Sequence, residues 1–221
     1  MYHIVRDIFS GEYRTNLAFK GGTLCYFLHK LDRFSTDLDI DLVRAVADED
    51  VFLSYIETLV AKYGKVKEKT RKHFAFFFLL SYGEADMNIK IEINTRIWTE
   101  NQYEIVSFFG LDILAQERST IFANTLVALT DRPSVVNRDI YDAYFFFQNM
   151  FPINEALIVE RTGKNTQEYL KYLRAYLEKK ANPKNLLDWL GEVLDPKQES
   201  WVTEKLWSEL MGVLEFQITM R

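Results

Sequence analysis

The sequence predicts a sheet domain of the α/β or α+β class followed by an all-helical part. Up to about residue 117, short strand-like runs alternate with helical patterns, and beyond that point helical patterns with polar capping residues dominate. Of the 221 residues, 48% are hydrophobic, which is enough for a substantial core. No Gly- or Ser-rich linker separates the parts. We therefore expect two domains, 1–117 and 118–221, packed together with the functional site in a cleft between them.

The first part reads as strands and helices in alternation. Runs of β-branched and aromatic residues predict strands near 17–20, 37–43, 65–69, 74–82, 88–94 and 103–109. Helical spacing predicts an opening helix, a helix at 23–30 and another that Asp48 opens as its N-cap.

The second part reads as helices throughout. Apolar spacing predicts them near 119–130, 138–147, 154–161, 166–179, 183–190 and 200–216. Asn182 followed by Pro183 is typical of an N-cap with proline in the first turn.

Composition narrows the class of protein. The net charge is −5 and neither half is strongly basic, so a polyanion must bind a local patch. The single cysteine, Cys25, forms no intramolecular disulfide and no cysteine-based zinc cluster, which fits a reducing compartment. The N-terminus has no signal-peptide pattern and the most apolar run, 74–80, is too short to span a bilayer. We expect a cytoplasmic protein that does not enter the membrane.

The segment Lys20-Gly21-Gly22-Thr23-Leu24 lies between a predicted strand and a predicted helix. Glycines let backbone N–H groups come close to phosphate, although a Gly-Gly pair is also common in an ordinary strand-to-helix turn.

Alternating carboxylates follow in Asp37-Leu38-Asp39-Ile40-Asp41. In an extended strand the three aspartates share one face at spacings of about 6.5–7 Å, where they repel each other. A divalent cation resolves this repulsion, whereas the alternative is the solvent face of an amphipathic strand. Together with the glycine turn, the carboxylates indicate phosphoryl or nucleotidyl transfer.

A basic run covers residues 62–72, where Lys65, Lys67, Lys69 and Arg71 occur at every second position. If extended, they share one face that could bind an RNA backbone. The alternative is an edge strand that lysines protect from aggregation.

These motifs resemble the AbiEii/AbiGii-type toxins, including the MenT toxins, which are minimal nucleotidyltransferases of the DNA polymerase β superfamily. The resemblance covers at least residues 18–147. The segments that carry it are Phe19-Lys20-Gly21-Gly22-Thr23, Arg33-Phe34-Ser35-Thr36-Asp37-Leu38-Asp39, Ile89-Lys90-Ile91-Glu92-Ile93, Ala128-Leu129, and Arg132 ahead of Arg138-Asp139-Ile140-Tyr141-Asp142.

The resemblance implies an α+β fold with a polymerase-β-like mixed sheet flanked by helices, followed by an α-helical bundle. It implies a toxin of a toxin–antitoxin or phage-defence system that uses Mg²⁺ or Mn²⁺ to transfer a nucleoside monophosphate from an NTP to an acceptor hydroxyl. The tRNA 3′ end is one acceptor that relatives suggest. A cognate antitoxin is the implied protein partner.

The resemblance also assigns roles to individual residues. It implies that nucleotide phosphates contact Gly21, Gly22 and Thr23, and that Ser35 positions the loop or the triphosphate. The metal is expected to bind Asp37 and Asp39, with Asp41 as a reserve ligand. Glu92 is expected to act as a third carboxylate beside Lys90. Lys90 and Glu92 could instead form a cross-strand ion pair.

In the later block, Thr125 stands where family members commonly carry a phosphate-binding lysine. Arg132, Arg138 or Lys90 would then supply the positive charge. Asp139 matches the acidic position of the family and is expected to face the cleft, whereas Arg138 and Asp142 could simply pair along a helix. Two other functions stay open: γ-phosphoryl transfer on the same fold, and a catalytically weak nucleotide-binding or interaction protein.

Overall fold

The structure, a computed structural model, describes residues 1–83 and 87–220. The chain divides into two compact units. The sheet unit contains residues 1–97 and 103–116, and the helical unit contains residues 98–102 and the chain from Glu117 onward. The short segment 98–102 thus interrupts the sheet unit, which the sequence pattern did not indicate.

A mixed sheet of seven strands forms the centre of the sheet unit, in the order β3-β4-β5-β2-β1-β7-β6. Its strands are β1 (Leu17–Lys20), β2 (Asp37–Leu42), β3 (Lys65–Lys72), β4 (Ala75–Tyr82), β5 (Met87–Asn94), β6 (Tyr103–Phe108) and β7 (Leu111–Gln116). β2 runs parallel to β5 and β1 parallel to β7, and the other neighbouring pairs are antiparallel. The prediction of a sheet domain with flanking helices is confirmed, and the sheet has the mixed topology of the α+β class.

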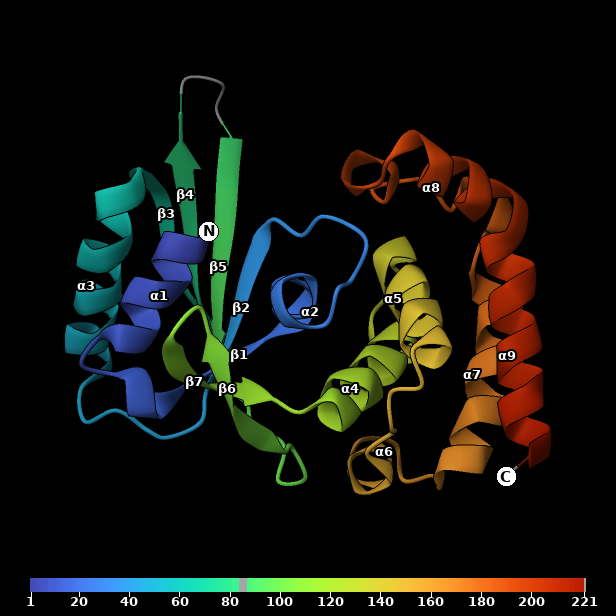
Figure 1. The fold of residues 1–221 in the computed structure, drawn as a ribbon. Coiled ribbons are helices and arrows are strands. Elements are labelled where there is room, and N and C mark those ends of the chain that lie inside the picture. Colours follow the sequence, from blue (N-terminus) through green and yellow to red (C-terminus); the bar gives the residue numbers. More distant parts are fainter. Residues whose placement is uncertain (84–86, 221) are drawn as a thin grey trace. The chain divides into compact units, whose positions relative to one another are not determined.

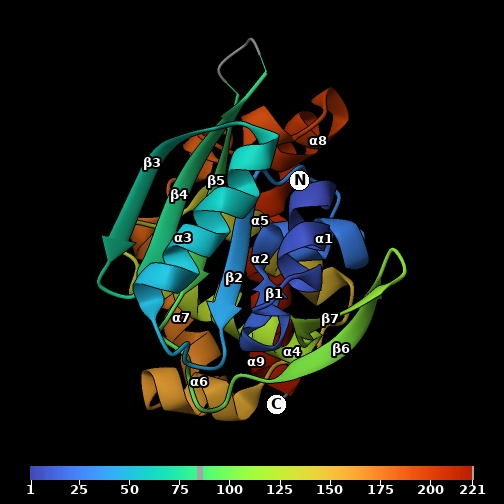
Figure 2. The ribbon, with the colours of Figure 1, turned by 90° about the vertical axis from the view of Figure 1, so that its left-hand side faces the viewer.

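Helices cover the two faces of this sheet differently. α1 (Tyr2–Ser10) and α3 (Glu49–Val60) lie on one face, and α2 (Gly21–Leu28) lies on the other beside β1 and β2 (Figures 1 and 2). The face under α1 and α3 carries buried apolar side chains such as Phe19, Ile40 and Phe76. Because side chains alternate along a strand, the aspartates of β2 belong to the opposite face.

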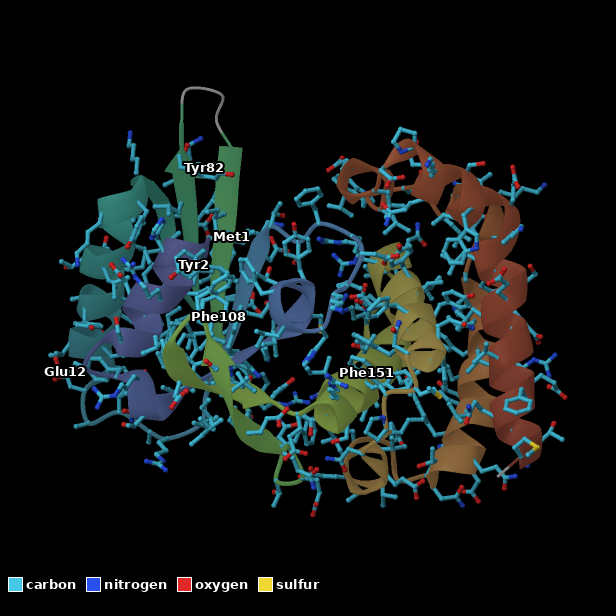
Figure 3. All side chains as sticks on the ribbon, viewed as in Figure 1. Met1, Tyr2, Glu12, Tyr82, Phe108 and Phe151 are labelled. Atoms are coloured by element: carbon cyan, nitrogen blue, oxygen red, sulfur yellow. The ribbon has the colours of Figure 1, made fainter. Side chains whose placement is uncertain are left out.

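Local signals explain where these elements begin. The Asp48 carboxylate accepts hydrogen bonds from the N–H groups of Asp50 and Val51, so the predicted N-cap of α3 is confirmed. Phe108, at the end of β6, packs against Tyr2 of α1 with ring centroids 5.6 Å apart (Figure 3). It also lies 5.4 Å from the ring of Phe27, so one aromatic side chain contacts helices from both sides of the sheet.

β7 was not predicted, because the turn before it contains a phenylalanine, a residue type that does not indicate a tight turn. Phe109 and Gly110 both have left-handed backbone angles, with φ of 49° and 85°. This turn joins β6 directly to β7, and a phenylalanine is an unusual residue there.

The basic run forms β3, an edge strand, but a bulge between Val66 and Glu68 breaks its alternation. Lys65 therefore no longer shares a face with Lys69 and Arg71, and the prediction of one continuous basic face is wrong. Lys69 pairs with Glu57 at 2.5 Å and Arg71 with Asp50 at 2.7 Å. Both cations thus form ion pairs with acidic side chains of α3.

The helical unit contains α4 (Arg118–Asp131), α5 (Asn137–Gln148), α6 (Glu155–Thr162), α7 (Thr166–Lys180), α8 (Pro196–Trp201) and α9 (Trp207–Met220). α7 and α9 lie side by side (Figure 1), and α4 contacts α5, α6 and α7. The first four agree with the predicted helices within two residues at each end.

Two predictions at the C-terminal end were wrong. The expected helix at 183–190 is a 3₁₀ turn over Pro183–Asn185, and Trp189 has a left-handed φ of 61° that a helix does not allow. The last helical stretch begins at Pro196 rather than Ser200, because Asp195 caps it. A π-helical turn over Val202–Leu206 connects α8 to α9. Across the two described ranges, we find no helix with the length and apolarity needed to cross a membrane.

Candidate active site

The glycine turn connects β1 to α2 and requires both of its glycines. Gly21 has a φ of +77°, and a Cβ at this position would overlap the Asp39 carboxylate. A Cβ on Gly22 would lie 2.9 Å from Arg33 Nη2 and 3.0 Å from Ser35 Oγ. The backbone at the start of α2, whose first N–H groups have no partner within the helix, therefore packs directly against the segment that leads into β2.

Hydrogen bonds brace this segment from within. Thr23 Oγ1 donates to the main-chain carbonyl of Asp37 and lies 2.8 Å from Ser35 Oγ. Thr23 is fully buried and Ser35 nearly so. The Thr23 hydroxyl thus joins α2 to β2, and the expected contact of Thr23 with phosphate stays a prediction.

Arg33 lies beside the glycine turn, although it was not among the residues expected at the site. It is only 5% exposed, and its Nη1 donates to the carbonyl of Phe34 at 2.9 Å. Its guanidinium lies against Gly22 and beside Ser35. In the structure, buried Leu31, Arg33 and Ser35 alternate with exposed side chains, as in an extended segment with one face covered. Residue type did not indicate this, because an arginine is at a buried position and Phe34 at an exposed one.

Asp37 and Asp39 lie on β2 with their side chains partly buried. In the sheet, Asp39 is directly opposite Lys20 on β1 and Glu92 on β5, and Asp37 is opposite Lys90. The pKa of Asp39 is raised to about 6: burial is the main cause, the charges of Asp37, Glu92 and Asp41 add to it, and Lys20 acts in the opposite direction. A second positive charge beside Asp39 would favour its ionised form.

Asp41 is fully buried and has a different environment from the other two aspartates. Its Oδ1 accepts from Lys20 Nζ at 2.7 Å and Asn94 Nδ2 at 3.1 Å. Its Oδ2 accepts from Tyr103 OH and Gln116 Nε2, both at 2.8 Å. With both oxygens occupied, Asp41 is an anchor for neighbouring strands, and we do not retain it as a reserve metal ligand.

Glu92 and Lys90 lie on β5 at the edge of this arrangement. Glu92 Oε2 lies 3.1 Å from Nζ of Lys72, a residue of β3, and about half of each side chain is exposed. The Lys72 ammonium also lies 4.1 Å from the centroid of the Phe77 ring. Glu92 thus has a cross-strand partner, but that partner is Lys72 rather than Lys90.

The donor set suits a hard cation in part. Within residues 1–83 and 87–220, no three His, Cys, Asp or Glu side chains form a group that could hold a metal ion. Asp37 and Asp39 supply carboxylate oxygens, and Mg²⁺ commonly takes one or two carboxylates together with substrate phosphates and water. The residues present therefore fit a magnesium ion that arrives with a nucleotide.

The later sequence block lies in the helical unit. Arg132 Nη1 pairs with the Asp139 carboxylate at 2.7 Å, where α4 ends and α5 begins. Arg138 is in the first turn of α5, and Asp142 is buried one turn later. Thr125 is partly buried in the middle of α4.

Residues 4–212 match the model of one protein family, described as the nucleotidyl transferase AbiEii toxin of a type IV toxin–antitoxin system. The chain belongs to this family. The resemblance that the glycine and aspartate motifs indicated is therefore confirmed, and so is the classification as a nucleotidyltransferase. A comparison with curated proteins returned no match.

Two solved structures from Helicobacter pylori share the fold of this AbiEii-family chain. JHP933 superposes with a TM-score of 0.61 at 19% identity, over 98% of this chain and 90% of that one. A second protein, described as a candidate nucleotidyltransferase, has a TM-score of 0.62 at 20% identity, over 98% of this chain and 92% of that one. The mixed sheet with flanking helices thus recurs in proteins of low sequence identity.

Proposed function

We propose that this AbiEii-family nucleotidyltransferase uses Mg²⁺ or Mn²⁺ to transfer a nucleoside monophosphate from an NTP to an acceptor hydroxyl. One observation carries the proposal: the glycine turn at the start of α2 packs directly on the Asp39 carboxylate. A phosphate held by backbone N–H groups at the turn is then beside the carboxylates that suit its metal ion.

Asp37 and Asp39 would hold the metal ion, which supplies charge neutralisation of the triphosphate and of the charge that develops at the transferring phosphorus. Gly21 and Gly22 offer N–H groups to the phosphate oxygens. Ser35 keeps this loop in place through Thr23. Each of these residues acts by position rather than by covalent chemistry.

The reaction forms one bond and breaks another. The acceptor oxygen attacks the α-phosphorus, the bond from that phosphorus to the bridging oxygen of the β-phosphate breaks, and pyrophosphate leaves. Glu92 is our candidate to accept the hydroxyl proton, because it faces Asp39 on the neighbouring strand and is accessible to solvent.

Other cations are available at the site even though Thr125 stands in place of the expected lysine. Lys20 and Arg33 both lie at the glycine turn, where a phosphate-binding cation is useful. Lys90, opposite Asp37, offers a third. Arg132 and Arg138 remain candidates from the helical unit, with Asp139 as the partner of Arg132. These groups favour an active transferase over a non-catalytic nucleotide-binding protein.

Family membership supports the biological setting. A toxin of a type IV toxin–antitoxin system has an antitoxin partner, and we propose that this chain acts in the cytoplasm with an RNA such as tRNA as the acceptor. The basic run of β3 forms no continuous face and two of its cations pair with acidic side chains, so this strand would offer RNA only a small set of contacts.

The test is transfer of label from each α-³²P NTP to total tRNA in the presence of Mg²⁺. We expect labelled RNA with the wild type, and at least about a 100-fold lower rate for Asp39→Asn or after chelation of the metal. Asp112→Asn, an exposed aspartate on β7, is the matched control and should keep full activity.

Label from γ-³²P NTP on the acceptor, with release of a nucleoside diphosphate, would instead establish phosphoryl transfer. Equal rates for the wild type and Asp39→Asn would contradict the proposed metal site.

A further inference from the structure

Phe34 is a large apolar side chain that the proposed reaction leaves unused. It is 62% exposed, and its ring lies on that of Tyr26 with centroids 5.4 Å apart and an angle of 29° between the planes. Tyr26 belongs to α2, and Phe34 belongs to the segment between α2 and β2. The two rings form an offset stack that we call the aromatic platform.

The segment under this platform is held on its inner side. The Leu31 N–H donates to the Cys25 carbonyl at 3.1 Å, and Arg33 and Ser35 are each only 5% exposed. Arg33 also donates to the carbonyl of Phe34 itself. A single exposed phenylalanine needs no explanation, but one that is fixed by its neighbours and backed by a second ring is organised before any ligand binds.

The platform has a defined position relative to the glycine turn. Gly22 and Tyr26 are four residues apart on α2, so they lie on the same side of the helix about 6 Å apart along its axis. Arg33 and Ser35 cover Gly22, and Phe34 covers Tyr26. A nucleotide whose phosphates occupy the helix start extends its base beyond them, and the platform is the exposed aromatic surface that follows the glycine turn along α2.

We infer that Phe34, backed by Tyr26, is the stacking surface for the base of the incoming NTP. The inference rests on the proposed function. Stacking accepts every base because each has a π face, so the platform would contribute affinity while leaving the choice of base to other contacts.

Binding of Mg²⁺ complexes of ATP, GTP, CTP and UTP tests the inference, with inorganic tripolyphosphate as a probe that has no base. We expect Phe34→Ala to weaken NTP binding about 10- to 100-fold and to leave tripolyphosphate binding unchanged. Phe34→Trp should restore NTP affinity, whereas Phe34→Leu, which keeps an apolar side chain without a ring, should not. Phe216→Ala on α9 is the control, since that ring is 59% exposed.

Three results would overturn the inference, each in a distinguishable way. Unchanged NTP affinity in Phe34→Ala and Phe34→Leu would remove the platform and leave the proposed function intact. Equal losses for NTP and tripolyphosphate would show that Phe34 only maintains the loop. No binding of any NTP by the wild type would refute the proposed function along with the platform.

Discussion

Asp39 is a carboxylate that is partly buried and lies close to other carboxylates, two conditions that disfavour its charged form. Its carboxylate packs on Gly21, lies opposite Lys20 and Glu92, and is partly withdrawn from water. Burial raises its pKa to about 6, and the nearby carboxylates outnumber the single ammonium that opposes them. A site that binds a cation has to keep this repulsion in the free protein, which costs stability.

The sign of the pH dependence follows from the direction of this shift. The pKa of Asp39 in the folded protein lies above the usual value of about 3.9, so folded protein binds its proton more tightly than unfolded protein does. Through this residue, stability is highest at low pH and falls as pH rises from about 4 to 6. At neutral pH the cost is at most about 3 kcal/mol.

We therefore predict that Asp39→Asn stabilises the metal-free protein while abolishing activity. Urea denaturation at pH 7.5 in the presence of a chelator should give a free energy of unfolding about 1–3 kcal/mol above that of the wild type. At pH 4 the difference should shrink, because the wild-type carboxyl is then protonated. A variant that is less stable than the wild type at both pH values would contradict this account, with Asp112→Asn as the reference.

At the scale of elements, Asp41 connects strands that are distant in the sequence. Its two oxygens accept from side chains of β1, β5, β6 and β7, and it belongs itself to β2. A buried charge is tolerated only where it is compensated, and here each oxygen has two donors. The same aspartate repeat thus contains metal-binding candidates at one end and a structural anchor at the other.

We predict that Asp41→Ala lowers the free energy of unfolding by about 3–5 kcal/mol, because it leaves buried donors and the Lys20 ammonium without their acceptor. Asp112→Ala, on the exposed side of β7, should change it by less than about 0.5 kcal/mol. Chemical denaturation at neutral pH measures both. Equal stabilities of the two variants would refute the anchor role.

At the scale of the whole molecule, the chain passes between the units more than once. Between β5 and β6 it contributes residues 98–102 to the helical unit, and it enters that unit again at Glu117. The Glu160 carboxylate of α6 accepts from the N–H groups of Thr99 at 2.8 Å and Glu100 at 3.0 Å. The Arg161 guanidinium also lies over the Trp98 ring, with its Cζ atom 5.3 Å from the ring centroid.

We predict that Glu160→Gln loosens this segment. Burial acts to raise the pKa of Glu160, but the two backbone donors outweigh it and the pKa is lowered overall. Its stabilising effect is therefore present above the ordinary carboxyl pKa and is lost as pH falls through the lowered value. Amide exchange at Thr99 and Glu100 should accelerate several-fold at pH 7 in the variant, while amides of β4 keep their protection. Unchanged exchange would contradict the role of Glu160.

Much of the fold could be predicted because local signals agreed with the tertiary structure. Asp48 caps α3 as expected, and β1 has the bounds that were predicted. The misses have identifiable causes. β7 follows a turn with a phenylalanine in a left-handed conformation, and Pro183 opens only a 3₁₀ turn although its N-cap residue is favourable. Neither backbone choice is decided by residues nearby in the sequence alone.

The sequence by itself determined the family, the glycine turn and the aspartate repeat, because these depend on residue type and on spacing along the chain. Only the tertiary structure decided what each aspartate contacts. Alternation placed Asp37, Asp39 and Asp41 on one face, but the neighbours brought by β1, β5, β6 and β7 buried one of them among four donors. The role of Arg33 also depends on a loop folding back onto α2. Packing sets the contacts between distant segments of the chain. These contacts differ among the carboxylates of the repeat, and so does the chemistry available to each of them.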